Sequence, residues 1–183
     1  DSNARGVNGN ASNNNAEKSG AVYLFERTEG KWRQRAYLKA SNSESGDDFG
    51  CSVAVFGTMV VVGAMLESGS ARGVNNNQSD NLAKNAGAAY VFEADAETWR
   101  QVAFLKASNS DAIDRFGCSV AIDGNIVIVG AHREDGAWSG EGGGEMSNNA
   151  SNSGAAYIFS LSNGVWAQRF YIKASNAEAN DEF

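Results

Sequence analysis

Apolar residues occur along this chain in short runs separated by turn-forming residues, a pattern typical of antiparallel strands. The runs Val53–Val55 and Met59–Val62 flank Phe56-Gly57-Thr58, and the same arrangement returns at 120–129 around an Asp-Gly dipeptide. Glycine tolerates the positive φ that a tight turn between two strands demands. Each pair of runs therefore predicts a hairpin, which we number as the first and second strands of a unit.

Two further strands follow each hairpin. The phrase Gly-Ala-x-Tyr-x-Phe, which starts at Gly20, Gly87 and Gly154, predicts a third strand, and a tryptophan-containing stretch such as Thr98–Lys106 predicts a fourth. The second strand is apolar on both faces, as expected of a sheet packed between two others. Four antiparallel strands in each unit predict a β-propeller blade. A parallel β-helix is the structural alternative, but its repeats are usually much shorter.

The unit recurs every 67 residues, and its tryptophans show this most clearly. They are Trp32, Trp99 and Trp166. A period of this size predicts supersecondary units that stack on one another, so we expect the three indole rings to be buried equivalently. The fold class is all-β, an incomplete propeller of about 2.7 blades.

The repeat also predicts how the chain is divided. Residues 1–45 supply the third and fourth strands of one blade, 46–112 and 113–179 are full repeats, and 180–183 begin another, all within one repeat-array domain. The 18 residues that would make three whole units correspond to Gly50–Glu67, one hairpin. We expect that hairpin to come from further sequence of a parent protein or, less favoured, from a neighbouring subunit.

The charge balance excludes two classes of partner. The chain carries 15 basic and 22 acidic side chains, a net charge of −7 at pH 7. This is the wrong sign for attracting nucleic acid or an anionic membrane surface. No apolar run is long enough to cross a bilayer as a helix, so membrane insertion of this segment is not expected.

Several motifs at fixed offsets resemble a known family. Asp47-Asp48-Phe49-Gly50 is followed by Val60-Val61-Val62-Gly63-Ala64, and both are echoed 67 residues later. The chain resembles the FG-GAP repeats of integrin α-subunit propellers and, more closely, secreted or surface-exposed FG-GAP repeat proteins. The resemblance implies an integrin-like propeller that is extracellular or at the cell surface and acts in cell adhesion or in binding protein or glycan.

The chain departs from the integrin pattern in two ways. It contains no proline, and Met65 and His132 stand where the family has the proline of Gly-Ala-Pro. Integrin blades hold calcium between the first two strands, where the turns of this chain carry at most one carboxylate; calcium needs several oxygen ligands. We therefore expect no cofactor and no metal at that position. Calcium in the long loops, or weakly at Asp47 and Asp114, is the alternative, against a turn-capping role for these two aspartates.

The connection from the second to the third strand is the most variable part of the unit. It spans about 65–86 and 132–153 and is rich in Asn, Ser and Gly. It predicts either a self-bonded surface loop or a recognition surface beside 43–47 and 111–114. The binding candidates, which lie in acidic or amide-rich parts of this connection, are Asn75, Asn77, Asp80, Glu134, Asp135, Trp138 and Glu141. Glu67 and Glu145 belong to the same acidic group.

The long connections also contain three glycosylation sequons, beginning at Asn10, Asn77 and Asn149. In a eukaryotic secretory context these would make the protein a glycoprotein, although such triplets also arise by chance in Asn- and Ser-rich loops. Cys51 and Cys118 occupy equivalent positions in successive units, and we expect two buried free thiols rather than a disulfide.

Nothing in the sequence predicts catalysis. The single histidine, His132, lies in a structural motif, and no nucleophile with a matching base can be named. Three functions remain open: a non-catalytic adhesion or binding propeller, a structural subunit of an extracellular fibre or assembly built from stacked copies, and an accessory propeller of a larger enzyme. The first is favoured, with a protein or glycan ligand, or copies of the chain itself, as partner.

Overall fold

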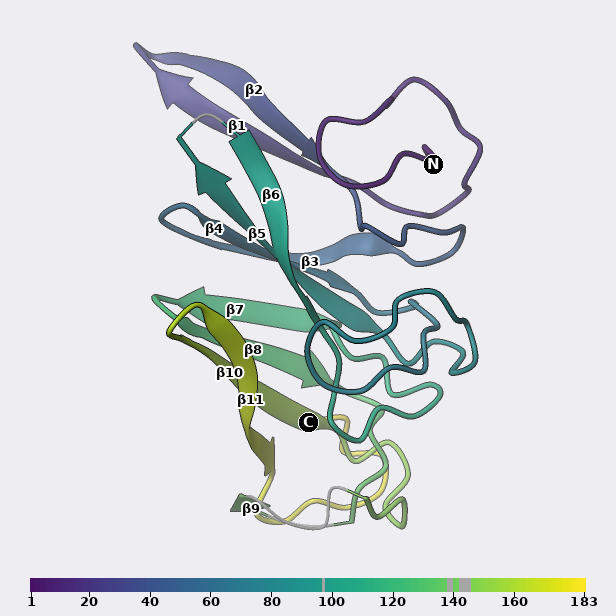
Figure 1. Cartoon of the computed structure of the whole chain (residues 1–183). Coiled ribbons are helices and arrows are strands. Elements are labelled where there is room, and N and C mark those ends of the chain that lie inside the picture. The colour runs from purple at the N-terminus through teal and green to yellow at the C-terminus, as the bar shows by residue number, and fades with distance from the viewer. Residues whose placement is uncertain (97, 138–139, 142–145) are drawn as a thin grey trace.

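The computed structural model describes residues 1–96, 98–137, 140–141 and 146–183, which form three antiparallel sheets stacked on one another (Figure 1). The first sheet is a hairpin of β1 (Val22–Thr28) and β2 (Lys31–Leu38). It lies at one end of the stack, and its two strands are joined by a turn at residues 29–30.

The second sheet contains the four strands expected of a complete unit. β3 (Phe49–Phe56), β4 (Met59–Ala64), β5 (Ala88–Asp95) and β6 (Thr98–Leu105) pair in chain order, and every pairing is antiparallel. The predicted hairpin is confirmed, because only residues 57–58 separate β3 from β4.

The third sheet repeats this order with one addition. β7 (Ser119–Asp123), β8 (Ile126–Ala131), β10 (Ala155–Ser162) and β11 (Val165–Lys173) follow one another, and the two-residue β9 (Gly140–Glu141) pairs with the end of β11. β9 belongs to the long connection and was not expected. Together the sheets form an incomplete, unclosed propeller, as predicted, with no helix among the described residues.

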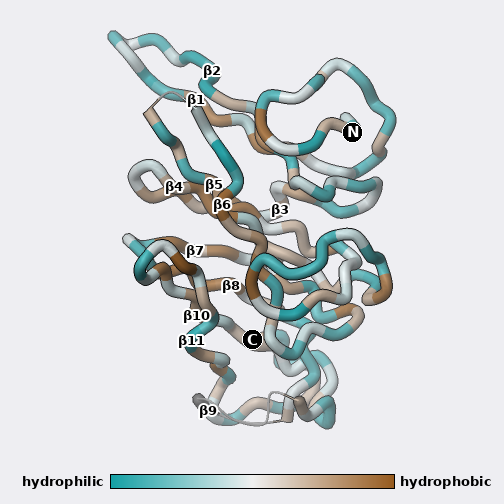
Figure 2. Tube along the Cα trace, viewed as in Figure 1, coloured by the Kyte–Doolittle hydropathy of each residue, from teal (hydrophilic) through white to brown (hydrophobic). Residues whose placement is uncertain are grey.

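Two hydrophobic cores hold the three sheets together, one at each junction. Alternate residues of β4 point to opposite cores: Val60 and Val62 pack toward β1–β2, whereas Val61 packs toward the third sheet. This explains why the second strand is apolar on both faces. In Figure 2 the hydrophobic segments lie along the middle of the strands, and the loops and the outer hairpin tips are mainly hydrophilic.

The glycine that opens each third strand permits a close approach of two backbones. Gly87 has φ +83° and forms an isolated parallel bridge with Phe116, whose N–H donates to Ala86 O at 2.9 Å. A Cβ at Gly87 would collide with the Phe116 carbonyl oxygen, so the position needs glycine for space as well as for conformation. Gly20 and Phe49 repeat this arrangement one unit earlier.

The expectation of equivalent tryptophan burial was wrong. Trp166 is 6% exposed, Trp99 is half-buried and Trp32 is 67% exposed. The two covered rings contact the sheet that precedes them in the stack: Trp166 lines a cleft with Met59, and Trp99 lines one with Leu24. No preceding sheet is present among the described residues to cover Trp32, which faces outward at the end of the stack.

The two cysteines are unpaired, as expected, but Cys51 is exposed and not buried. It lies on β3, which is an edge strand of the second sheet. Its sulfur approaches Gly117 O at 3.5 Å, and burial of part of the side chain raises the pKa of the thiol.

Candidate loop-face binding site

The long connections between the second and third strands gather along one side of the stack, which we call the loop face (Figure 1). As predicted, each lies beside the connection that joins two successive repeats. At the first junction Asn81 Nδ2 donates to Glu44 Oε2 at 2.6 Å, and Leu66 N donates to Asp47 O at 3.3 Å.

A polar cleft of about 370 Å³ opens on the loop face at this first junction. Most of its lining side chains carry hydrogen-bonding groups, and the full lining is Glu44, Ser45, Gly46, Asp47, Leu66, Ser68, Asn81, Lys84 and Asn85. Lys84 and Glu44 are exposed, so one ammonium group and one carboxylate are available to a ligand at the cleft.

The second junction keeps the same backbone contacts but different side chains. Asn148 Nδ2 donates to Asp111 Oδ2 at 3.0 Å, the counterpart of the Asn81–Glu44 bond. At this junction Ile113 replaces Gly46, and Arg133 replaces Leu66. Both substitutions bring larger side chains, and Ser151 takes the place of Lys84, so the charge pattern of the first cleft is not repeated.

Asp47 and Asp114 cap turns, which confirms the structural interpretation of these residues. Asp47 Oδ2 accepts from Glu44 N at 2.7 Å, and Asp114 Oδ2 accepts from Asp111 N at 2.8 Å. Asp181 repeats the bond with Glu178 N at 2.8 Å. Burial raises the pKa of Asp47 to about 6 and that of Asp114 to about 7, mainly because the charged carboxylates lose hydration.

Glu134 was expected on the loop face, and that expectation was wrong. Its side chain is buried, and Oε2 accepts from Lys173 Nζ at 2.6 Å. Glu67 is buried in the same way, with Oε2 2.9 Å from Lys106 Nζ. Each of these buried carboxylates is paired with a lysine, so neither glutamate is available to a ligand on the surface.

The buried ion pairs belong to a polar network that crosses each junction. At the first, Tyr90 OH donates to Asn42 Oδ1 at 2.8 Å, and Asn42 Nδ2 donates to Glu67 Oε1 at 3.0 Å. At the second, Tyr157 and Asn109 repeat these two bonds to Glu134. The network therefore ties the Lys-Ala-Ser-Asn run of one repeat to the third strand of the next.

Sequence reasoning missed this network. The signal was present in the strict 67-residue spacing of Glu67 and Glu134 and of the lysine that opens each Lys-Ala-Ser-Asn run. A charged residue that recurs with the fold in the same way as the core aromatics has a structural role, whereas a residue that varies among repeats lies at the surface.

Three of the other predicted binding residues are held by internal hydrogen bonds, Asn77 and Asp80 within their own loop and Asn75 to β6. Asn75 Oδ1 accepts from Phe104 N at 2.8 Å, Asn77 Nδ2 donates to Asp80 Oδ2 at 2.9 Å, and Asp80 Oδ1 accepts from Ser70 N at 2.8 Å. The bond from Ser70 is the main reason that the pKa of Asp80 is lowered. These contacts match a self-bonded surface loop at these positions.

The remaining candidates lie in the third repeat. Asp135 Oδ1 accepts from Asn152 N at 2.7 Å, which fixes the end of its loop. Trp138 and Glu145 lie outside the described residues, and only the backbone of Glu141 is described, as part of β9. The asparagines of the three sequons, Asn10, Asn77 and Asn149, are exposed.

The comparison with known families gives the identity of the repeat. The sequence model described as "FG-GAP repeat" matches residues 32–92 and 99–159, together about two thirds of the chain. The chain belongs to the FG-GAP repeat family. No curated protein matches it closely enough to count as a relative.

The structure shows the two features in which this FG-GAP chain departs from the integrin-type pattern, the short turn after the first strand and the residue in the proline position. The turns between first and second strands are two residues long, at 57–58 and 124–125. His132, in the proline position, is half-buried, and burial lowers the pKa of its imidazole. Across the part of the chain that the structure describes, no three His, Cys, Asp or Glu side chains are grouped to hold a metal, and no helix could span a membrane.

Proposed function

We propose that this FG-GAP chain is part of a non-catalytic, extracellular propeller that acts in adhesion, or in binding a protein or glycan, through its loop face. The polar cleft at the first junction carries the proposal. It joins the long connection of one repeat to the inter-repeat connection before it, where Asn81 meets Glu44. Clefts with a few convergent polar groups are typical ligand sites.

The chemistry of the cleft suits a polar ligand with several hydrogen-bonding groups. Lys84 offers an ammonium group for a carboxylate or hydroxyl, and Glu44 offers an acceptor for hydroxyl or amide protons. The amides of Asn81 and Asn85 can both donate and accept. Such a mixture fits the hydroxyl groups of a glycan or the backbone and polar side chains of a protein.

The contrast between strands and loops supports a binding role. The strand phrase Gly-Ala-x-Tyr-x-Phe is kept in all three copies, whereas cleft positions such as Gly46 and Lys84 change to Ile113 and Ser151 in the next repeat. A rigid scaffold with variable loops is a common way to present binding residues. The buried acids support the absence of catalysis, since Glu67 and Glu134 are held by lysines in the core.

The test measures binding of the chain to an array of glycans and immobilised extracellular matrix proteins. We expect a ligand whose affinity falls about tenfold, roughly 1.4 kcal/mol, in Lys84→Ala and in Asn81→Ala. The matched control is Asn148→Ala, which removes the equivalent amide at the second junction. Absence of binding across the array would contradict the proposal, as would equal losses in Asn81→Ala and Asn148→Ala.

A further inference from the structure

Each internal junction of the stack contains the same cluster of three aromatic rings. The backbone of Phe49 is bonded to the preceding repeat through Ser19 O, and its ring packs edge-on against Tyr90 and Phe92 of its own sheet, with ring centroids 5.4 and 6.0 Å apart. Phe116 repeats these contacts with Tyr157 and Phe159, at 5.3 and 6.0 Å. Two copies at nearly identical distances define how one repeat receives the next.

The same junctions share a polar clamp. At the first, Ser41 N donates to Gln101 Oε1 at 3.1 Å, and Gln101 Nε2 donates to Ser41 Oγ at 2.9 Å. At the second, Ser108 and Gln168 make both bonds, at 3.0 and 2.7 Å. The clamp fixes the register of adjacent sheets, because the glutamine amide contacts a backbone and a side-chain group of one residue.

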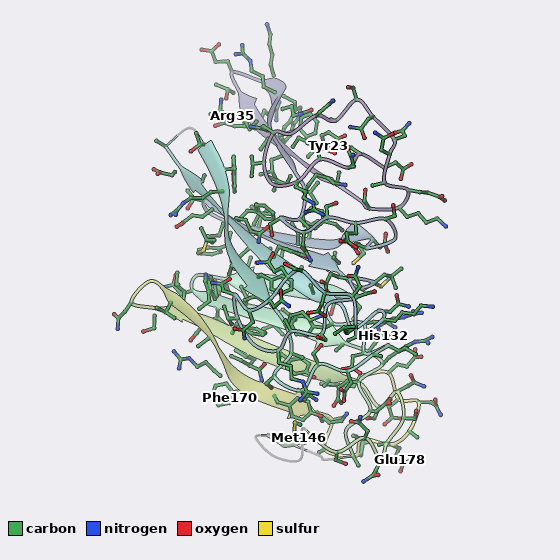
Figure 3. The ribbon with its side chains drawn as sticks, turned by 45° about the vertical axis from the view of Figure 1, so that its right-hand side comes forward. Tyr23, Arg35, His132, Met146, Phe170 and Glu178 are labelled. Atoms are coloured by element: carbon green, nitrogen blue, oxygen red, sulfur yellow. The ribbon has the colours of Figure 1, made fainter. Side chains whose placement is uncertain are left out.

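The two ends of the stack expose the two halves of this junction. The head face is the outer surface of β1–β2, with Tyr23, Phe25, Trp32 and Gln34. The tail face is the outer surface of the third sheet with the segment that follows it, and comprises Ile128, Phe170, Ser175, Asn176 and Phe183. Figure 3 shows Tyr23 at one end of the stack and Phe170 at the other.

The aromatic members of both faces are exposed where their internal counterparts are buried. Phe183, the counterpart of Phe49 and Phe116, is 50% exposed on the tail face. Tyr23 and Phe25, the counterparts of Tyr90 and Phe92, are 50% and 56% exposed on the head face. The tail thus carries the single phenylalanine of the aromatic cluster, and the head carries the two rings that receive it.

The polar groups are divided between the faces in the same way. Gln34, the clamp glutamine, lies on the head face, and Ser175, the clamp serine, lies on the tail face. Asn176 corresponds to Asn42, which accepts the hydroxyl hydrogen of Tyr90, and Tyr23 is the head-face counterpart of Tyr90. All four side chains are exposed.

The tail segment is also already held in the position that an internal junction requires. Phe183 N donates to Ser153 O at 3.2 Å, as Phe49 N does to Ser19 O and Phe116 N to Ala86 O. The tail phenylalanine is therefore placed by its own sheet. It does not need a second copy to order its backbone, which lowers the entropic cost of association.

Charge favours contact between unlike faces over contact between like faces. The hairpin 22–38 carries four basic and two acidic side chains, whereas residues 174–183 carry three acidic and no basic ones. Opposite net charges steer the two faces together and disfavour head-to-head and tail-to-tail pairing.

We propose that the head face of one copy of this chain binds the tail face of a second copy, in the register that links successive repeats inside the chain. Phe183 of the first copy would enter between Tyr23 and Phe25 of the second, and Ser175 would meet Gln34. Such an interface is heterologous, so it can extend to further copies. The first sheet has two strands where the others have at least four. The contact is therefore smaller than an internal junction and is expected to be weak and concentration-dependent.

Sedimentation velocity over a dilution series of the whole chain tests the proposal. We expect wild-type protein to associate as its concentration rises. Phe25→Glu on the head face and Phe183→Glu on the tail face should each weaken self-association by more than about tenfold. An equimolar mixture of these two variants should form dimers, because one intact head and one intact tail remain.

The matched control is Leu82→Glu, which alters an 83% exposed side chain in a loop and should associate like wild type. Circular dichroism checks that all variants are folded. A wild-type chain that stays monomeric, or a variant mixture that does, would overturn the proposal. The proposal would also be overturned if Trp32 became buried only in a chain to which a further repeat had been fused. That result would assign the head face to a covalently linked repeat.

Discussion

Trp166 and Trp32 occupy the same position in the repeat, on β11 and β2, but 6% of the Trp166 surface is exposed and 67% of the Trp32 surface. The difference does not come from their own strands, which have closely similar hairpin registers. It comes from the neighbouring sheet, because the second sheet covers Trp166 and no sheet precedes Trp32 among the described residues. A repeat of this family therefore completes only part of its own core, and its neighbour decides which residues are buried.

The lysines show the same contrast between an interior junction and the end of the stack. Lys173 donates to the Glu134 carboxylate, whereas Lys39 donates to Ser19 Oγ at 2.7 Å and to Gly20 O at 2.5 Å, both neutral groups. Loss of hydration lowers the pKa of Lys39. One recurring residue thus forms a buried ion pair at one position and a set of neutral hydrogen bonds at another.

The largest expected difference is between the two tryptophans. Trp166→Ala should reduce the free energy of unfolding by about 3–5 kcal/mol, because it leaves a cavity against Met59. Trp32→Ala should change the free energy of unfolding by less than about 0.5 kcal/mol at dilutions where the chain is monomeric. Chemical denaturation of both variants measures this, with Trp99→Ala expected between them. Equal losses for Trp32 and Trp166 would show that burial by the neighbouring sheet is not the cause.

The lysines provide the second comparison. Lys173→Met should cost about 3 kcal/mol, since it leaves the Glu134 carboxylate buried without its cation. We expect the low end of the range because Tyr171 OH, Asn109 Nδ2 and Gly136 N still donate to that carboxylate.

Lys39→Met serves as the matched control for this substitution. It removes a buried ammonium that has only neutral acceptors, so its effect on the free energy of unfolding should stay within about 1 kcal/mol. Urea denaturation at pH 7 compares the two variants. A cost for Lys39→Met as large as that for Lys173→Met would contradict the distinction between paired and unpaired lysines.

The smallest expected effect concerns the two capping aspartates, Asp47 and Asp114, which should contribute differently to the pH dependence of the free energy of unfolding. Their pKa values are raised to about 6 for Asp47 and about 7 for Asp114, above the ordinary value of 3.8. Between about pH 4 and these values the folded chain binds more protons than the unfolded chain. The contribution of each group to stability therefore falls as pH rises through that window.

The difference of about one pKa unit corresponds to roughly 1.4 kcal/mol, so Asp114→Asn should flatten the pH dependence of unfolding more than Asp47→Asn does. Asparagine keeps an oxygen that can accept from the capped backbone amide. Thermal unfolding between pH 4 and 8 measures the effect. A wild-type stability that rises from pH 5 to pH 7.5, and does so equally in Asp114→Asn, would contradict the assignment.

The candidate site was only partly predictable. The sequence predicted that the long connection lies beside the inter-repeat connection, because both leave a four-stranded antiparallel sheet at the same end, and Asn81 and Glu44 confirm this. It did not predict which acidic residues face the solvent. Glu134 is buried because a lysine from the fourth strand of its own sheet reaches it, and this contact between residues 39 positions apart depends on how the sheet folds.

By itself, the sequence determined the repeat, the strands and their order. Period-2 alternation, Gly turns and the strict 67-residue spacing act locally, through backbone conformation and the side on which each residue points. Only the tertiary structure decided which copies of a recurring residue are buried, paired or exposed. Trp32, Tyr23 and Lys39 differ from their counterparts because burial and electrostatic pairing depend on the neighbouring sheet, and a local pattern does not include that neighbour.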